Sequence, residues 1–149
     1  MKKFPFFFII FILILSSCSI ETPESTIERI ERELYETKNI NILHENVYCP
    51  ESCISKIEFE TRMEYSKVQE LMKEEFLKET EGLVIDKFQI TGRRFEDSAN
   101  VYLEYRMIFI QDEKGELIEP REDFVYLKRI EERWYIDVYK ELFEHESVE

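Results

Sequence analysis

The sequence has few of the residues that build phosphate-binding loops and the common catalytic sites. It contains only three glycines, two histidines and one tryptophan in 149 residues. A loop that cradles phosphate needs closely spaced glycines, and no G-x-S-x-G or H-E-x-x-H pattern is present. The sequence therefore predicts no catalytic residue, no metal site and no cofactor. It leaves enzymatic activity open while favouring a non-enzymatic role.

Basic residues are also scarce. Twenty lysines and arginines stand against 33 aspartates and glutamates, which gives a formal net charge of −13. Nucleic-acid binding needs a basic surface that displaces counterions from phosphates, and attraction to anionic lipids needs basic clusters as well. We therefore expect no nucleic-acid partner and no electrostatic attachment to a membrane.

No apolar run is long enough to span a bilayer. Phe4 to Leu15 is a stretch of 12 residues that follows Lys2 and Lys3. As a helix it would measure about 18 Å, against a hydrocarbon core of about 30 Å. A basic start followed by a short apolar segment is typical of an export signal.

The end of that apolar segment resembles the bacterial lipobox. Leu15-Ser16-Ser17-Cys18 places an aliphatic residue and two small residues before a cysteine. The resemblance implies cleavage before Cys18, lipid on its sulfur, and an extracytoplasmic protein held on the cell membrane, or on the outer membrane if the host has one. The alternative is an ordinary secretory signal in which Cys18 is incidental. Cleavage would leave 18 basic and 33 acidic residues, a formal net charge of −15.

We expect one α+β domain in the rest of the chain. The predicted division is a signal peptide over 1–17, a lipidated tether over 18–22, the domain over 23–142 with a cysteine loop at 38–55, and an acidic tail over 143–149. Thr22-Pro23 and the capping box Ser25-x-x-Glu28 predict a helix that continues to about Thr37.

The following segments alternate between the two periodicities. Lys56 to Tyr65 has apolar residues at every second position and predicts a strand. A helix from Ser66 to Gly82 follows, with an apolar stripe typical of an amphipathic helix. Four strands over about 83–95, 99–111, 122–130 and 133–141 then form an antiparallel meander, because their connections are short. The turns are expected at Asp97-Ser98, Asp112 to Gly115 and Glu131-Glu132. We expect a curved sheet packed on helices.

This order of elements, over about 22–141, resembles the nuclear transport factor 2-like (cystatin-like cone) superfamily. The stretch that carries the resemblance runs from Phe124-Val125-Tyr126-Leu127-Lys128 through Arg133-Trp134-Tyr135-Ile136. It is similar to the last hairpin of that superfamily. The resemblance implies a concave pocket between the sheet and the helices. It implies no particular function, because this fold hosts enzymes, scaffolds and binding modules.

Cys49 and Cys53 are the most distinctive pair in the domain. Once Cys18 carries lipid, these two remain in an exported protein, where a disulfide is favoured. The alternatives are a redox-active pair, a soft-metal site that also uses His44, and two free thiols.

Candidate pocket residues follow from strand parity. Asp86 shares its parity with Phe88 and Ile90 and is expected to face inward, and Tyr105 is the second pocket candidate. Asp137 is expected to face outward, because it alternates with Trp134 and Ile136. His145 is expected to be solvated in the acidic tail.

Exposed aromatic residues indicate a possible partner. Tyr135 and Tyr139 lie on the other parity of the last strand and favour a homodimer or an envelope protein on that face. Three hypotheses remain: a binding or accessory module anchored to the envelope, a pocket enzyme with a carboxylate general base, and a thiol- or metal-handling protein that uses Cys49 and Cys53.

Overall fold

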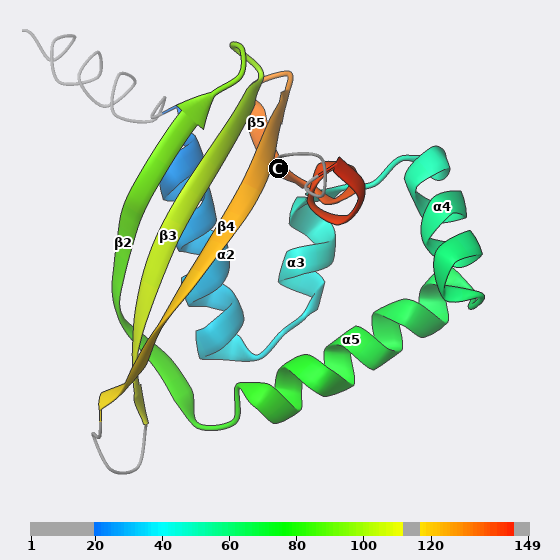
Figure 1. Cartoon of the computed structure of the whole chain (residues 1–149). Helices are drawn as coiled ribbons and strands as arrows, with labels where there is room; N and C mark the ends of the chain where they lie inside the picture. The colour runs from blue at the N-terminus through cyan, green and yellow to red at the C-terminus, as the bar shows by residue number, and fades with distance from the viewer. Residues whose placement is uncertain (1–19, 112–116, 145–149) are drawn as a thin grey trace, which may run out of the picture.

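The computed structural model describes residues 20–111 and 117–144 (Figure 1). A sheet curves over α2, and the remaining helices lie on the same concave side. The elements are α2 Pro23–Thr37, α3 Asn41–Asn46, β1 Val47–Tyr48, α4 Glu51–Thr61, α5 Tyr65–Glu79, β2 Leu83–Phe95, β3 Asn100–Gln111, β4 Leu117–Ile130, β5 Arg133–Asp137 and the π-helical turn η1 Lys140–Glu144.

The sheet has five strands in the order β1-β5-β4-β3-β2. Strands β2 to β5 form the predicted antiparallel meander, whereas β1 pairs with β5 in parallel, so the sheet is mixed. The register of β2 against β3 shifts between Ile85 and Lys87 and again between Ile90 and Gly92. Such bulges strengthen the twist and curvature of a sheet.

Helix α2 is the core helix, and it begins as the sequence predicts. Thr22 is the N-cap, Pro23 occupies the first turn, and Thr22 and Ser25 form a reciprocal capping box. The Ser25-x-x-Glu28 pattern is therefore not the box that is used. Ile27 and Ile30 are each 1% exposed and pack with one face of β3, where every second residue from Val101 to Phe109 is buried.

The predicted strand over 56–65 is wrong, because this segment belongs to α4 and the start of α5. Cys53 and Ile57 are buried one helical turn apart, and this spacing of four residues places them on one face. Phe59, which suggested a strand by alternation, is 80% exposed. The helix ends at Thr61, and the C-cap residue Arg62 has a left-handed backbone (φ 55°).

Other boundaries also differ from the prediction. The cysteine loop expected over 38–55 contains α3, β1 and the first turn of α4. Strand β4 begins at Leu117 instead of residue 122, and β5 ends at Asp137, after which the chain turns into η1. The predicted turns at Asp97-Ser98 and Glu131-Glu132 are present, and Glu131 has a positive φ of 57°.

Several predictions fall on residues outside the described ranges. These are the signal segment with Cys18, the turn from Asp112 to Gly115, and His145 with the rest of the acidic tail after Glu144. Within the described ranges, every helix is too short or too polar to cross a bilayer.

Candidate functional site

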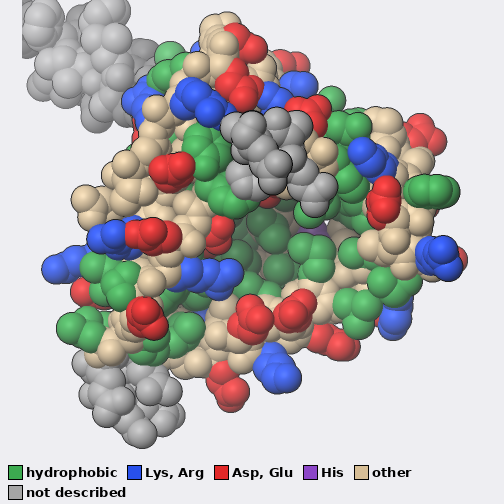
Figure 2. Space-filling view, in the orientation of Figure 1, with side chains coloured by type: hydrophobic (Ala, Val, Ile, Leu, Met, Phe, Trp, Pro, Cys, Tyr) green, Lys and Arg blue, Asp and Glu red, His purple; other side chains and the backbone are tan. Residues whose placement is uncertain are grey.

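A cavity of about 510 Å³ lies between the concave face of the sheet and the helices that stand away from it. Figure 2 shows the hollow, with apolar side chains inside and a histidine at its back. Its walls come from every layer of the fold. Apolar lining residues are Ile27, Leu43, Val47, Ile57, Val68, Met72, Phe124, Val125, Ile136, Val138, Leu142 and Phe143.

Helix α5 forms the outer wall of this cavity, and it is weakly packed. None of its residues is buried. It contacts the helices beside the sheet through Gln69, whose Nε2 hydrogen-bonds to His44 Nδ1 at 3.3 Å, and through Phe76, whose ring packs edge-on against Tyr35 with centroids 5.7 Å apart. The cavity exists because α5 spans the open side of the sheet instead of sinking onto it.

A carboxyl–phenol pair lies on the inner side of the cavity. The Tyr105 hydroxyl donates a hydrogen bond to Glu31 Oε1 at 2.7 Å, which joins β3 to α2. Tyr105 is 3% exposed, whereas Glu31 is half-buried because part of it faces the cavity. Burial raises the pKa of Glu31 to about 7, and the Tyr105 hydrogen bond opposes this rise. The pKa of Tyr105 is raised well above its usual value by burial and by the charge of Glu31.

Two further acids extend this pair across the cavity. Asp123 of β4 and Glu141 of η1 both line it. Burial raises the pKa of Glu141 to about 8, although the backbone N–H of Tyr126 donates to its Oε1 at 3.2 Å. Asp123 raises the pKa of both Glu31 and Glu141 by repulsion. The site therefore holds carboxyl groups that change charge near neutral pH.

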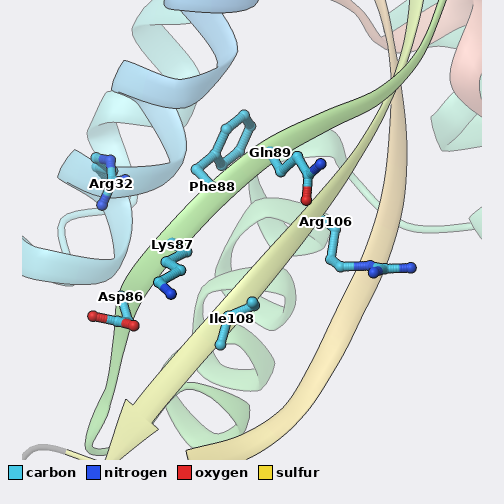
Figure 3. A pocket seen from close by; sticks show the side chains of 7 residues that line it. All are labelled: Arg32, Asp86, Lys87, Phe88, Gln89, Arg106 and Ile108. Atoms are coloured by element: carbon cyan, nitrogen blue, oxygen red, sulfur yellow. The ribbon is translucent and has the colours of Figure 1, made fainter.

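The two predicted pocket candidates lie in different places. Tyr105 lines the cavity, whereas Asp86 is exposed at the bulge between Ile85 and Lys87. The bulge shifts the parity, so that Ile85 and Phe88 face inward and Asp86 does not. Asp86 lines a separate open depression of about 370 Å³ between α2, β2 and β3, shown in Figure 3.

Sequence reasoning missed Glu31 and Glu141. A signal for Glu31 does exist: it lies four residues after Ile27 and three before Leu34, so it shares the apolar face of the predicted helix. Glu141 has no such signal, because the sequence places it at the end of a strand.

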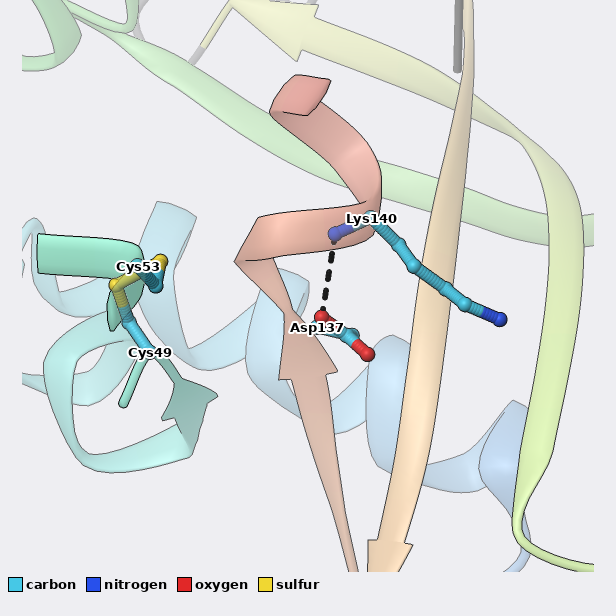
Figure 4. Close-up of a disulfide and its surroundings, with 4 residues drawn as sticks. All are labelled: Cys49, Cys53, Asp137 and Lys140. Atoms are coloured by element: carbon cyan, nitrogen blue, oxygen red, sulfur yellow. Dashed lines mark hydrogen bonds between the residues drawn. A yellow bond between two sulfur atoms is a disulfide. The ribbon is translucent and has the colours of Figure 1, made fainter. Parts of the chain in front are cut away.

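The cysteine pair is joined. Cys49 and Cys53 form a disulfide with their Cα atoms 5.3 Å apart, and it links the end of β1 to the first turn of α4 (Figure 4). Cys53 is fully buried. His44 is bonded to Gln69. Among the described residues, no group of three or more His, Cys, Asp and Glu side chains is arranged to hold a metal ion.

Asp137 differs from its expected orientation. It is 6% exposed, and its Oδ1 accepts a hydrogen bond from the backbone N–H of Lys140 at 3.2 Å (Figure 4). It therefore caps the start of η1. Tyr135 and Tyr139, the expected partner residues, are half-buried; Tyr139 packs against Phe143, and the Lys56 ammonium group lies over its ring.

Comparison with one solved structure supports the fold. A protein from Campylobacter jejuni described as an NTF2-like transpeptidase matches with a TM-score of 0.55 and 13% identity, over 78% of this chain and 98% of that one. The fold resembles that of an NTF2-like protein. A SEC-C motif containing protein from Rhodopseudomonas palustris matches with a TM-score of 0.49 and 15% identity, over 84% of this chain and 82% of that one. No protein-family model and no curated protein matches the sequence.

Proposed function

We propose that this protein is an envelope lipoprotein that acts as a binding module, and that its cavity takes up a small, largely apolar molecule. The observation that carries the proposal is the cavity itself. Its volume of about 510 Å³ falls within the usual range for small-molecule sites, about 300–1,000 Å³. An apolar lining with a few convergent polar groups is also the usual composition of such sites.

Blocking the cavity tests this proposal. Val68 of α5 lines it, whereas Leu77 of the same helix does not and is 38% exposed. We expect the wild-type protein to take up the neutral dye Nile red saturably, with a rise in fluorescence. The Val68→Trp variant should lose this uptake, and the matched Leu77→Trp variant should keep it. Equal uptake by Val68→Trp, or no saturable uptake by the wild type, would contradict the proposal.

The lipid anchor is tested separately. Two or three acyl chains hold a protein on a bilayer stably, and the net charge of the chain offers no electrostatic substitute. We expect the full-length protein to sediment with membranes after expression in a bacterium that processes lipoproteins, and Cys18→Ala to be released. Membrane retention of Cys18→Ala would contradict the anchor.

A second candidate function is a pocket enzyme in which Glu31 is the general base. The observation in its favour is a carboxyl group with a pKa of about 7 beside a phenol, since a general base works best near the ambient pH. Cyclohexanone in deuterated water is a simple probe of proton abstraction. Faster α-proton exchange that disappears in Glu31→Gln would support the enzyme, and no acceleration would favour the binding module.

The partner face is a further part of the proposal. A second copy of the chain or an envelope protein would contact the side of the sheet that carries Tyr135. Analytical ultracentrifugation of the domain is the direct test, and a dimer that Tyr135→Glu dissociates would support it. A monomer over the whole concentration range would leave only a heterologous partner.

A further inference from the structure

The cavity is apolar and negatively charged at the same time. No lysine or arginine is among the described residues that line the cavity, and His44 is the one histidine among them. The acidic lining residues are Glu31, Glu60, Asp123 and Glu141. Arg121 lies at the adjoining hollow beneath α5, which Glu31 and Asp123 also line, and its Nε lies 3.9 Å from Asp123 Oδ2.

The carboxyl group of Glu31 lines the cavity with one of its oxygens bonded inside the protein. Its Oε1 accepts the hydrogen bond from Tyr105, and its Oε2 has no hydrogen bond from the part of the chain that is described. Oε2 is accessible to solvent, and Glu31 lines both the cavity and the adjoining hollow beneath α5. An anionic carboxyl group in apolar surroundings is unfavourable unless a positive charge pairs with it.

We propose that the ligand of this cavity is an amphipathic organic cation, with an apolar body against the helices and a protonated amine against Glu31 and Glu141. This inference rests on the proposed binding function and narrows it to one ligand class. Anionic amphiphiles such as fatty acids are disfavoured, because their head group would meet the carboxyl groups of Glu31 and Glu141. Neutral apolar molecules would fill the space and leave Glu31 and Glu141 without a cationic partner.

The charge state of the site makes binding depend on pH. The titratable groups that face Glu31 are Tyr35 on its own helix, Tyr105 of β3, Arg121 and Asp123 of β4, and Glu141 of η1. In the empty cavity Glu31 and Glu141, with pKa values of about 7 and about 8, carry protons over part of the neutral range. An ammonium group favours their charged forms, so binding releases protons and becomes tighter as pH rises, until the amine itself loses its proton.

Three probes with the same alkyl chain test the inference: octylamine, octanol and octanoate. We expect calorimetry to show octylamine binding about tenfold more tightly than octanol, and octanoate not binding. Octylamine should also bind more tightly at about pH 8 than at about pH 6. Glu31→Gln should weaken octylamine about tenfold and leave octanol unchanged. Glu36→Gln, an exposed change on the same helix, is the matched control and should behave as the wild type.

The outcomes separate the inference from the function on which it rests. If octanol or octanoate binds as tightly as octylamine, the inference of a cationic ligand is wrong, while the proposed binding function of the cavity is retained. If Glu31→Gln and Glu36→Gln weaken octylamine equally, a general loss of negative charge explains the effect and the Glu31 site is wrong. If none of the three probes binds, both the inference and the proposed function fail.

Discussion

The two sides of the cavity are built on different principles. On the sheet side, α2 buries Ile27, Ile30, Leu34 and Tyr35 against the strands. On the opposite side, no residue of α5 is buried, and apolar residues such as Leu71 and Met72 are 43% and 52% exposed. The first side is a packed scaffold. The second is a wall that surrounds space, held at its ends and by a few side-chain contacts.

This difference shows where the fold obtains its stability and where the site obtains its freedom. Burial of apolar surface is the main stabilising contribution to a folded chain, and nearly all of it lies between α2 and the sheet. Segments with few buried contacts open locally at low cost in free energy. The wall can therefore move to admit a molecule while the scaffold keeps Glu31 and Tyr105 in place.

The largest contrast should come from truncating one leucine on each side. Leu103 of β3 is fully buried, whereas Leu71 of α5 is 43% exposed. We expect Leu103→Ala to lower the free energy of unfolding by about 2–5 kcal/mol, and Leu71→Ala to change it by less than about 0.5 kcal/mol. Urea unfolding measures both. Equal losses would mean that the wall belongs to the core.

Removing the disulfide should have the next largest effect. Cys49 and Cys53 close a short loop at the base of the α4–α5 arm, which comprises residues 51–79. We expect Cys49→Ala/Cys53→Ala to lose about 2 kcal/mol on the chain-entropy estimate for so short a loop. Reductant should destabilise the wild type by a similar amount and leave the double variant unchanged. A wild type that is insensitive to reductant would argue against the bond.

The Glu31 carboxyl group should reduce stability as pH rises. Its pKa is about 7 in the folded protein against 4.5 for the ordinary group, so the folded state holds the proton more tightly, and stability falls as pH increases through this window. Glu31→Gln removes that loss. We expect the Glu31→Gln variant to be more stable than the wild type by about 1–2 kcal/mol at pH 8. This value is smaller than the full pKa shift would give, because the group faces the cavity and is partly screened by solvent. At pH 4 the two proteins should differ little in stability. Thermal unfolding across pH measures this, and Glu36→Gln should show no such trend.

The smallest effect should be confined to the wall. Gln69 is bonded to His44, and Gln69→Ala should cost less than about 1 kcal/mol in global stability. It should nevertheless speed amide hydrogen exchange along α5 and not along α2. Gln89→Ala, an exposed glutamine of β2, is the control. Uniform acceleration in both helices would contradict a separately mobile wall.

The same contrast explains what the sequence could predict. Helix α2 and strand β3 bury one face each, so their periodicity is clear, and the predicted Thr22-Pro23 start of α2 and turn at Asp97-Ser98 are present. The alternation of Ile57, Phe59, Met63 and Tyr65 misled, because the α4–α5 arm has almost no buried face to impose a period of 3.6. A periodic pattern identifies an element only where one face of it is buried, and little of the α4–α5 arm is buried.

The candidate site was predictable only in part. Tyr105 follows from strand parity, but Asp86 does not reach the cavity, because a single bulge reverses its orientation and no residue type announces that bulge. Glu31 is one acid among 33 aspartates and glutamates. Only its position on the apolar face of α2 distinguishes it, and its role depends on a hydroxyl 74 residues away.

The link between β1 and α4 has a consequence for when the cavity becomes complete. Thiols stay reduced in most cytosols and pair after export. If the chain is exported as we propose, it leaves the cytosol with Cys49 and Cys53 reduced. The disulfide at the base of the α4–α5 arm then forms only after the chain has crossed the membrane. Before export, the protein would therefore bind small molecules of the cytosol only weakly.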